Sequence, residues 1–119
     1  MSPRTRSRTR SRRPLPSVFF AARFAALGDT TRLALVGRLS SGQPASIAQL
    51  TAGSRLSRQA IAKHLGVLRR AGMVHSTRVG REQHFTLDPE PMHEMQQYLD
   101  HVSRQWDQAL ARLKAFVED

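Results

Sequence analysis

Four side chains within residues 57–72 have the chemistry to contact nucleic-acid bases. They repeat at i, i+1, i+4 and i+5, and they are Arg58, Gln59, Ala62 and Lys63. A helix places residues at this spacing on one face, and Ile61, Leu65 and Leu68 form a second, apolar face that needs a core. Arg and Lys bind guanine or phosphate, Gln binds adenine, and the Ala methyl group tolerates close approach to thymine. The pattern predicts a helix that lies in the major groove of DNA; the alternative is an amphipathic helix with a solvated polar face.

Length and composition limit the chain to a few classes of protein. Its 119 residues suffice for one domain with a modest core, to which oligomerisation would add stability. The absence of cysteine excludes disulfides, thiolate metal sites and thiol redox sensing. An enzyme is not expected, because the chain has no glycine-rich phosphate loop, no nucleophile elbow and no base with an orienting partner.

The basic charge is concentrated in two regions of the chain. Residues 1–13 carry six Arg and no acidic residue, and residues 55–84 have a net charge of +6. Residues 88–119 have a net charge of −4, whereas the whole chain has +10. This layout predicts a polyanionic partner, double-stranded DNA, that contacts the first two regions.

Residues 1–17 alternate Arg with Ser and Thr and offer nothing that could form a core. We expect a disordered Arg-rich arm that lies along phosphates or in a minor groove; the alternative is a passive solubilising tail. The pair Arg12-Arg13 before apolar residues is similar to a twin-arginine export signal, but Arg23 interrupts the run and no cleavage site stands out. No other stretch is apolar enough to span a membrane, so we expect a cytoplasmic protein.

Two helices are expected before the polar face. The first covers residues 17–27, ends at Gly28 and has an apolar face that consists of Phe20, Phe24 and Leu27. The second is expected to be capped by Asp29, whose carboxylate accepts hydrogen bonds from the backbone N–H groups of residues 31 and 32. It is expected to end at residues 40–42, and its inward residues are expected to be Leu33, Val36 and Leu39.

A short helix and a tight turn are expected directly before the polar face. Ser46 is expected to cap a helix over residues 47–52, and residues 53–55 to form the turn. Leu56 is expected to pack against the next helix, which Ser57 caps. A short helix, a turn and a capped helix with a polar face predict a helix-turn-helix.

The hydrophobic period changes from 3.6 to about 2 after Gly72. Residues 73–79 and 82–87 are predicted strands joined by a two-residue turn at Gly80 and Arg81, and Val74, Phe85 and Leu87 are expected to face the core. Polar and basic residues gather near the turn, namely Arg78, Arg81, Gln83 and His84. We expect this hairpin to act as a wing on the DNA backbone or minor groove; the alternative is an edge hairpin with solvated charges.

The last helix is expected to begin after Asp88 and to carry a long apolar seam. Apolar residues recur at alternating spacings of 3 and 4, at Met92, Met95, Leu99, Val102, Trp106, Ala109, Leu113 and Phe116. A seam of about 40 Å exceeds what a small domain needs for its own core. We predict a homodimer through this helix with the first helix alongside; the alternative is packing within one chain. The predicted interface consists of Phe20, Phe24, Met95, Leu99, Val102, Trp106 and Leu113.

Several of these segments together resemble one family of bacterial and archaeal regulators. The segments are residues 24–33 (FAALGDTTRL), 56–65 (LSRQAIAKHL), 67–74 (VLRRAGMV) and the pair Gly80-Arg81. They resemble the ArsR/SmtB-type repressors over roughly residues 18–117. The resemblance implies a mainly α-helical winged helix-turn-helix with a small β-hairpin, dimeric through its terminal helices. Carried over residue by residue, it assigns DNA contact to Ser57, Arg58, Gln59, Ala60, Lys63, His64, Arg78 and Arg81.

The metal ligands of many members of that family are missing here. Residues 46–50 replace the Cys-x-Cys stretch, and Pro91 stands two residues before His93 in place of the first ligand on the last helix. His93 and His101 could share a helix face, but two imidazoles and one carboxylate fall short of a metal site. We therefore expect no metal and no cofactor. Whether an unidentified small-molecule or protein inducer exists is left open.

These observations predict an arm over residues 1–17 and one domain for DNA binding and dimerisation over residues 18–119. The predicted function is that of a sequence-specific transcriptional regulator, a dimeric repressor that reads an inverted-repeat operator through helix 57–71 and wing 73–87. The alternatives are a protein that coats DNA without sequence preference and a winged helix that binds another protein.

Overall fold

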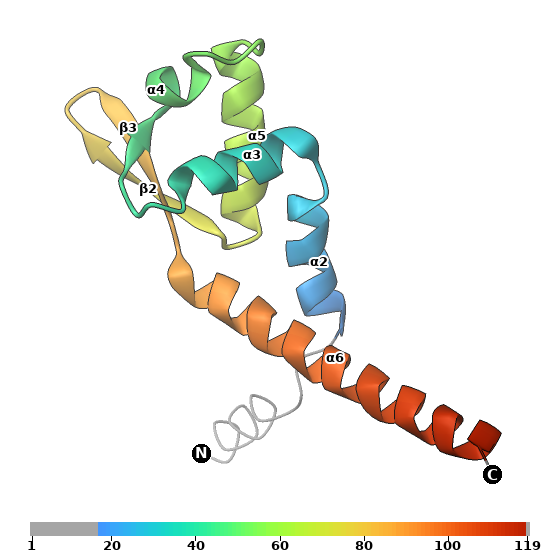
Figure 1. Ribbon diagram of the computed structural model, residues 1–119. Helices are drawn as coiled ribbons and strands as arrows, with labels where there is room; N and C mark the ends of the chain where they lie inside the picture. Colours follow the sequence, from blue (N-terminus) through green and yellow to red (C-terminus); the bar gives the residue numbers. More distant parts are fainter. Residues whose placement is uncertain (1–16, 119) are drawn as a thin grey trace, which may run out of the picture.

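The computed structural model describes residues 17–118, a mainly helical chain with one small sheet (Figure 1). Its elements are, in order, α2 (Ser17–Leu27), α3 (Thr30–Leu39), β1 (Ala45–Ser46), α4 (Ile47–Thr51), α5 (Arg58–Arg70), β2 (Val74–Val79), β3 (Glu82–Leu87) and α6 (Pro89–Glu118). The mainly α fold with a β-hairpin, predicted from the sequence, is confirmed. The arm predicted over residues 1–17 lies outside the described residues except for Ser17, at which α2 begins. Within the described chain, no helix combines the length and the apolar character that crossing a membrane requires.

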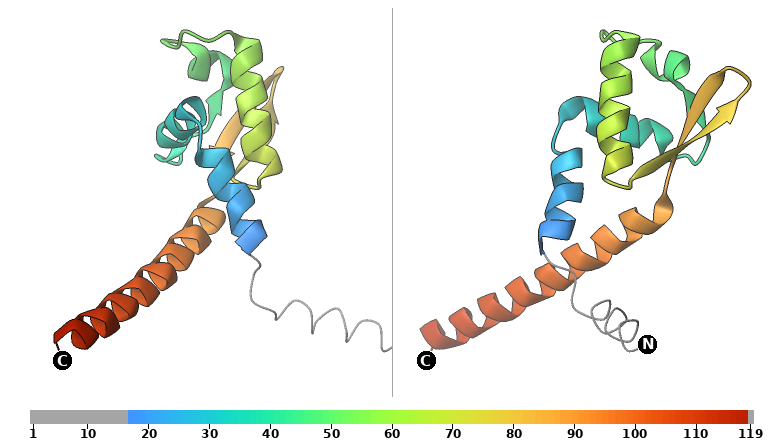
Figure 2. Two further views of the ribbon diagram at one scale, coloured as in Figure 1. Left: turned by 90° about the vertical axis from the view of Figure 1, so that its right-hand side faces the viewer. Right: turned by 180° about the vertical axis from the view of Figure 1, so that it is seen from behind.

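The described chain consists of a head and a long projecting helix (Figures 1 and 2). The head contains α3, α4, α5 and the sheet, and α2 connects it to the first half of α6. The 30 residues of α6 extend about 45 Å at 1.5 Å per residue. In all three views no other described element lies beside the C-terminal half of α6.

Side-chain caps begin α4 and α5, as predicted. Ser46 Oγ accepts a hydrogen bond from Gln49 N at 3.1 Å, and Gln49 Oε1 accepts one from Ser46 N at 2.8 Å. Ser57 Oγ accepts a hydrogen bond from Ala60 N at 3.2 Å. These bonds satisfy N–H groups that have no partner inside the helix, so both helices of the helix-turn-helix begin at defined residues.

The core is formed where α5 crosses α3. The predicted inner face of α5 is confirmed, because Ile61, Leu65 and Leu68 are at most 1% exposed. They pack in one cluster with the buried residues of α3, which are Leu35, Val36 and Leu39. The prediction that Leu33 points inward is wrong, since its side chain is 55% exposed. The buried face of α3 follows i, i+3, i+4 and i+7 from Arg32, and Leu33 lies about 100° further round the helix.

A three-stranded antiparallel sheet in the order β1-β3-β2 completes the head. β2 and β3 pair along their full length, and Gly80 begins the predicted turn with a φ of +64°, which side chains with a Cβ rarely adopt. Val74 and Phe85 are buried, as predicted. β1 pairs with β3 and was not predicted, because two residues are too few to show alternation.

α2 packs against the first half of α6 through aromatic and polar contacts. Phe20 stacks on Tyr98 with ring centroids 4.5 Å apart, and Arg23 Nη1 donates to Glu94 Oε1 at 2.9 Å. Phe20 and Met95 are only 6% and 3% exposed. Because these two side chains are already buried within one chain, we leave them out of the dimer interface that we propose below.

Candidate nucleic-acid interface

The polar face of α5 reaches the surface near the beginning of the helix. Three long side chains are exposed there, and they are Arg58, Gln59 and Lys63. Ala62 is half-buried beside them, the capping residue Ser57 is exposed, and Ala60 is half-buried. Because the opposite face of α5 lies in the core, these side chains are presented from a helix whose rotation is held by packing.

A cleft of about 430 Å³ joins this face to the tip of the hairpin. Its lining includes Arg58, Gln59 and Ala62 of α5 and, from the hairpin, the consecutive residues Arg81, Glu82 and Gln83. The start of α4 lines it as well. Residues more than 20 positions apart in the sequence therefore form one surface, which pairs hydrogen-bonding groups on α5 with a guanidinium group on the wing.

Arg78 and His84 of the predicted wing tip do not line this cleft, whereas the acidic residue Glu82 does. Arg78 is exposed on β2, opposite Gln83 in the strand register, and does not line the cleft. Glu82 is the acidic residue at the tip, and its Oε1 lies 3.0 Å from His84 Nε2. The tip thus presents two Arg side chains and one carboxylate that already has a partner, a composition that suits contact with phosphates.

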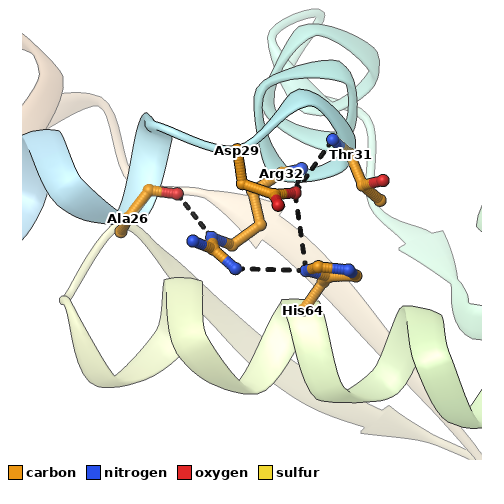
Figure 3. Close-up of polar contacts among 5 residues, drawn as sticks. All are labelled: Ala26, Asp29, Thr31, Arg32 and His64. Carbon is orange, nitrogen blue, oxygen red and sulfur yellow. Dashed lines mark hydrogen bonds and ion pairs between the residues drawn. The ribbon is translucent and has the colours of Figure 1, made fainter.

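His64, predicted to contact DNA, is instead held against the junction of α2 and α3 (Figure 3). Arg32 Nη1 lies 3.2 Å from His64 Nδ1 and donates to it when the imidazole proton is on Nε2. Asp29 Oδ2 lies 3.7 Å from the same nitrogen, and the His64 side chain is only 24% exposed. We therefore leave His64 out of the interface, since its Nδ1 contacts residues of the protein itself.

Asp29 links this junction to the start of α3, as the sequence predicts. Its Oδ2 accepts hydrogen bonds from the backbone N–H groups of Thr31 at 2.9 Å and Arg32 at 3.1 Å. The hydrogen bond from the backbone N–H of Arg32 is the main reason why the pKa of Asp29 lies below its ordinary value of 3.8. The positive charge of the Arg32 side chain lowers the pKa further. The junction therefore holds an ionised carboxylate next to a guanidinium and an imidazole.

Sequence reasoning missed the role of Arg32 in positioning α5. Its Nε donates to Ala26 O at 2.6 Å while its Nη1 reaches His64, so one side chain connects α2, α3 and α5 (Figure 3). The signal was available, because Arg32 stands at the first position of the i, i+3, i+4, i+7 set that is buried in α3. A charged residue at a core-facing position needs polar partners inside the fold.

From Leu99 onward, α6 carries large apolar side chains that the described residues 17–118 leave exposed. Exposed fractions are 52% for Leu99, 64% for Trp106 and 58% for Leu113, whereas Val102 and Phe24 are half-buried. Leu110, Phe116 and Val117 are also exposed. Of the predicted interface residues, Leu99, Trp106 and Leu113 thus share one face of α6 that is exposed within the described chain.

The histidines of α6 belong to no cluster of potential metal ligands in the described chain. Within residues 17–118, no group of three or more His, Cys, Asp and Glu side chains is arranged to hold a metal ion. His93 and His101 are both exposed.

The sequence is related to known transcriptional regulators. Residues 27–77 match a family model described as a helix-turn-helix domain, which corresponds to α3 through most of β2. The HTH-type transcriptional regulator Rv2034 of Mycobacterium tuberculosis is 36% identical over 93 residues, which cover 78% of this chain and 83% of the relative. YuzN of Bacillus subtilis, named as an uncharacterized HTH-type transcriptional regulator, is 39% identical over 75 residues, 58% of this chain and 82% of the relative.

The fold is also that of a solved regulator. The ArsR-like transcriptional regulator from Rhodococcus sp. RHA1 superposes with a TM-score of 0.75 at 34% sequence identity. The match covers 84% of this chain and 93% of that chain, so it extends beyond the helix-turn-helix.

Proposed function

Because the chain belongs to the ArsR-like family of helix-turn-helix transcriptional regulators, we propose that it is a dimeric, sequence-specific repressor of transcription. The observation that carries this proposal is the cleft between the start of α5 and the wing tip. In it, side chains that can read base edges face a side chain that can bind phosphate. A surface of this kind can recognise sequence and fix its register on the duplex at the same time.

We place α5 in the major groove with its first two turns towards the bases. Arg58 and Gln59 are the base-reading residues, because their bidentate groups match guanine and adenine edges. Lys63 lies one turn further along α5 on the same face. Ser57 and Ala60 lie next to Arg58 and Gln59, and we propose that they contact the DNA as well. Arg78 and Arg81 of the wing contact the adjacent backbone, which positions the helix without reading sequence.

A second copy of the chain completes the site. The exposed apolar face of α6 would pair with the same face of a partner, and a two-fold dimer would present two copies of α5 to two half-sites. Residues 88–119 have a net charge of −4, which favours an α6 pair that lies away from the phosphates. The operator would therefore be an inverted repeat.

The other parts of the proposal follow from DNA as the partner. A regulator works where the chromosome is, so we place the protein in the bacterial cytoplasm at the nucleoid. Its relatives are transcriptional regulators, and we propose no enzymatic activity. No observation favours a protein that only coats DNA or one that binds another protein through the winged helix.

Selection of bound sequences from random duplexes tests specific reading. Arg58→Ala and Gln59→Ala should relax the preference at one or two base positions, at about 1–3 kcal/mol each. Arg81→Ala should weaken binding to all sequences alike, and it should make the slope of log K against log salt concentration less steep by about 0.9. The charge-matched control is Arg104→Ala, because Arg104 is exposed on α6. It should change neither the base preference nor the salt slope. Equal weakening of every sequence by all three interface variants would favour the coating protein instead.

Removal of residues 1–13 tests the basic arm separately. Each phosphate contact made by the arm contributes about 0.9 to the salt slope, so a smaller slope would assign such contacts to the arm. An unchanged slope would make residues 1–13 a passive tail.

A further inference from the structure

A second cleft lies on the helix-turn-helix, separate from the candidate DNA interface. Its volume is about 450 Å³, within the range of small-molecule sites. Its lining comes mainly from α3 and from residues 52–56, the turn that joins α4 to α5. Its inner wall is apolar, and it is formed by Leu35, Leu50 and Ile61, which are at most 4% exposed. The two clefts share no lining residue, although α4 and α5 contribute to both.

The mouth of this second cleft is positively charged. Arg38 of α3 and Arg55 of the turn line it, both are exposed, and no acidic residue among residues 17–118 lines it. Arg38 is fixed in place, because its Nη2 donates to Gln49 O at 3.1 Å and its Nη1 to Leu50 O at 3.4 Å. These bonds use two of the five N–H groups of the guanidinium, so the others can bind an anion. A cleft with an apolar interior and a cationic mouth favours a ligand that has an apolar part and an anionic part.

We propose that this cleft binds a small amphipathic carboxylate. The apolar body of the ligand would lie on Leu35, Leu50 and Ile61, and its carboxylate would bind Arg38 and Arg55 at the mouth. A neutral analogue would lose the charge-assisted hydrogen bonds, a bare anion would gain nothing from the apolar wall, and an amphipathic cation would be repelled.

The position of the cleft makes its occupant an effector, a step that rests on the proposed DNA-binding function. The ligand contacts α3 and the turn of residues 52–56 together, and that turn leads directly into Ser57 and α5. A ligand that fits the cleft best when the turn stands away from α3 displaces the first turn of α5 relative to the wing tip. Binding of the carboxylate and binding of DNA then oppose each other by the same factor in both directions.

Calorimetry on the full chain tests the site without any DNA. The probes share one apolar body, and they are 4-phenylbutanoate, 4-phenylbutanol and 4-phenylbutylamine, with inorganic phosphate as the bare anion. The carboxylate should bind about tenfold more tightly than any of the others. Arg38→Gln and Arg55→Gln should each lower carboxylate affinity about tenfold and leave the alcohol unaffected, while Arg104→Gln on α6 should have no effect.

A blocking variant separates this cleft from other apolar surfaces such as α6. Ala34 is exposed on α3 and lines the cleft, so Ala34→Phe should fill it and abolish carboxylate binding while the chain stays folded. Failure of the carboxylate to bind at millimolar concentration would overturn the site. Equal binding to Ala34→Phe, or tighter binding of phosphate than of the carboxylate, would overturn it as well.

A DNA titration with a selected duplex then tests the effector role. Saturating carboxylate should raise the dissociation constant for DNA about fivefold or more in the parent chain and leave it unchanged in Ala34→Phe. An unchanged value in the parent chain would refute the effector role and leave the site standing. If the parent chain binds no duplex at all, the proposed repressor function fails, and calorimetry still decides whether the cleft takes the carboxylate.

Discussion

Replacement of Trp106 by Ala tests whether the projecting half of α6 forms the dimer. Trp106 lies just past the midpoint of α6 and is 64% exposed within one chain, with Leu99 and Leu113 on the same exposed face. Its side chain is largely exposed within the described chain, so its removal should leave the fold of the head intact. A change in the oligomeric state after this substitution therefore reports on the contact between copies.

The expected magnitude follows from the exposed area of Trp106. An aromatic side chain buries about 150–250 Å², so the exposed 64% of a Trp corresponds to roughly 160 Å². At about 25 cal/mol per Å², full coverage by a partner would contribute about 4 kcal/mol, and half coverage about 2 kcal/mol. A two-fold dimer contains the residue twice, so the substitution should cost about 4–8 kcal/mol and raise the dissociation constant at least ~10³-fold.

Sedimentation velocity over a series of protein concentrations measures this change. The parent chain should sediment as a dimer and Trp106→Ala as a monomer at the same concentration. Gln108→Ala is the control, because Gln108 is exposed on α6 and lies about 200° round the helix from Trp106. A dimer that persists in Trp106→Ala would refute the assignment of the interface to this face, and so would equal dissociation of the control.

Three further substitutions test local features of the fold by urea unfolding. Ser57→Ala should lower the free energy of unfolding by about 1 kcal/mol, because it removes the cap of α5; an unchanged value would show that the cap adds nothing. Gly80→Val should cost about 1–2 kcal/mol through its positive φ, whereas the control Gly37→Ala in α3, where a Cβ meets nothing, should not destabilise. The lowered pKa of Asp29 means that its contribution is complete above the pKa of an unfolded Asp and is lost as pH falls through the lower folded value. Asp29→Asn keeps a cap acceptor but does not titrate, so it should lose less stability than the parent chain between pH 7 and pH 2.5; parallel losses would contradict this role of Asp29.

Local features of this chain could be predicted from the sequence because the atoms that create them are close in the chain. The caps at Asp29 and Ser57 join atoms two or three residues apart, and the inner face of α5 follows from a period of 3.6. The tight turn at Gly80 depends on one backbone conformation that glycine allows. The polar face of α5 could be recognised for the same reason, since the pattern of one helix is enough to place its side chains on one side.

Contacts across the fold could not be predicted in this way. Hydrophobic spacing showed that Met95 and Trp106 belong to one seam, but the partner of each depends on where α2 meets α6, and only the first is covered. His64 has the spacing of a DNA contact, yet Arg32, 32 residues earlier, occupies its Nδ1. A sequence pattern shows which side chains share a face, whereas packing between distant segments determines whether that face meets the core, solvent or another molecule.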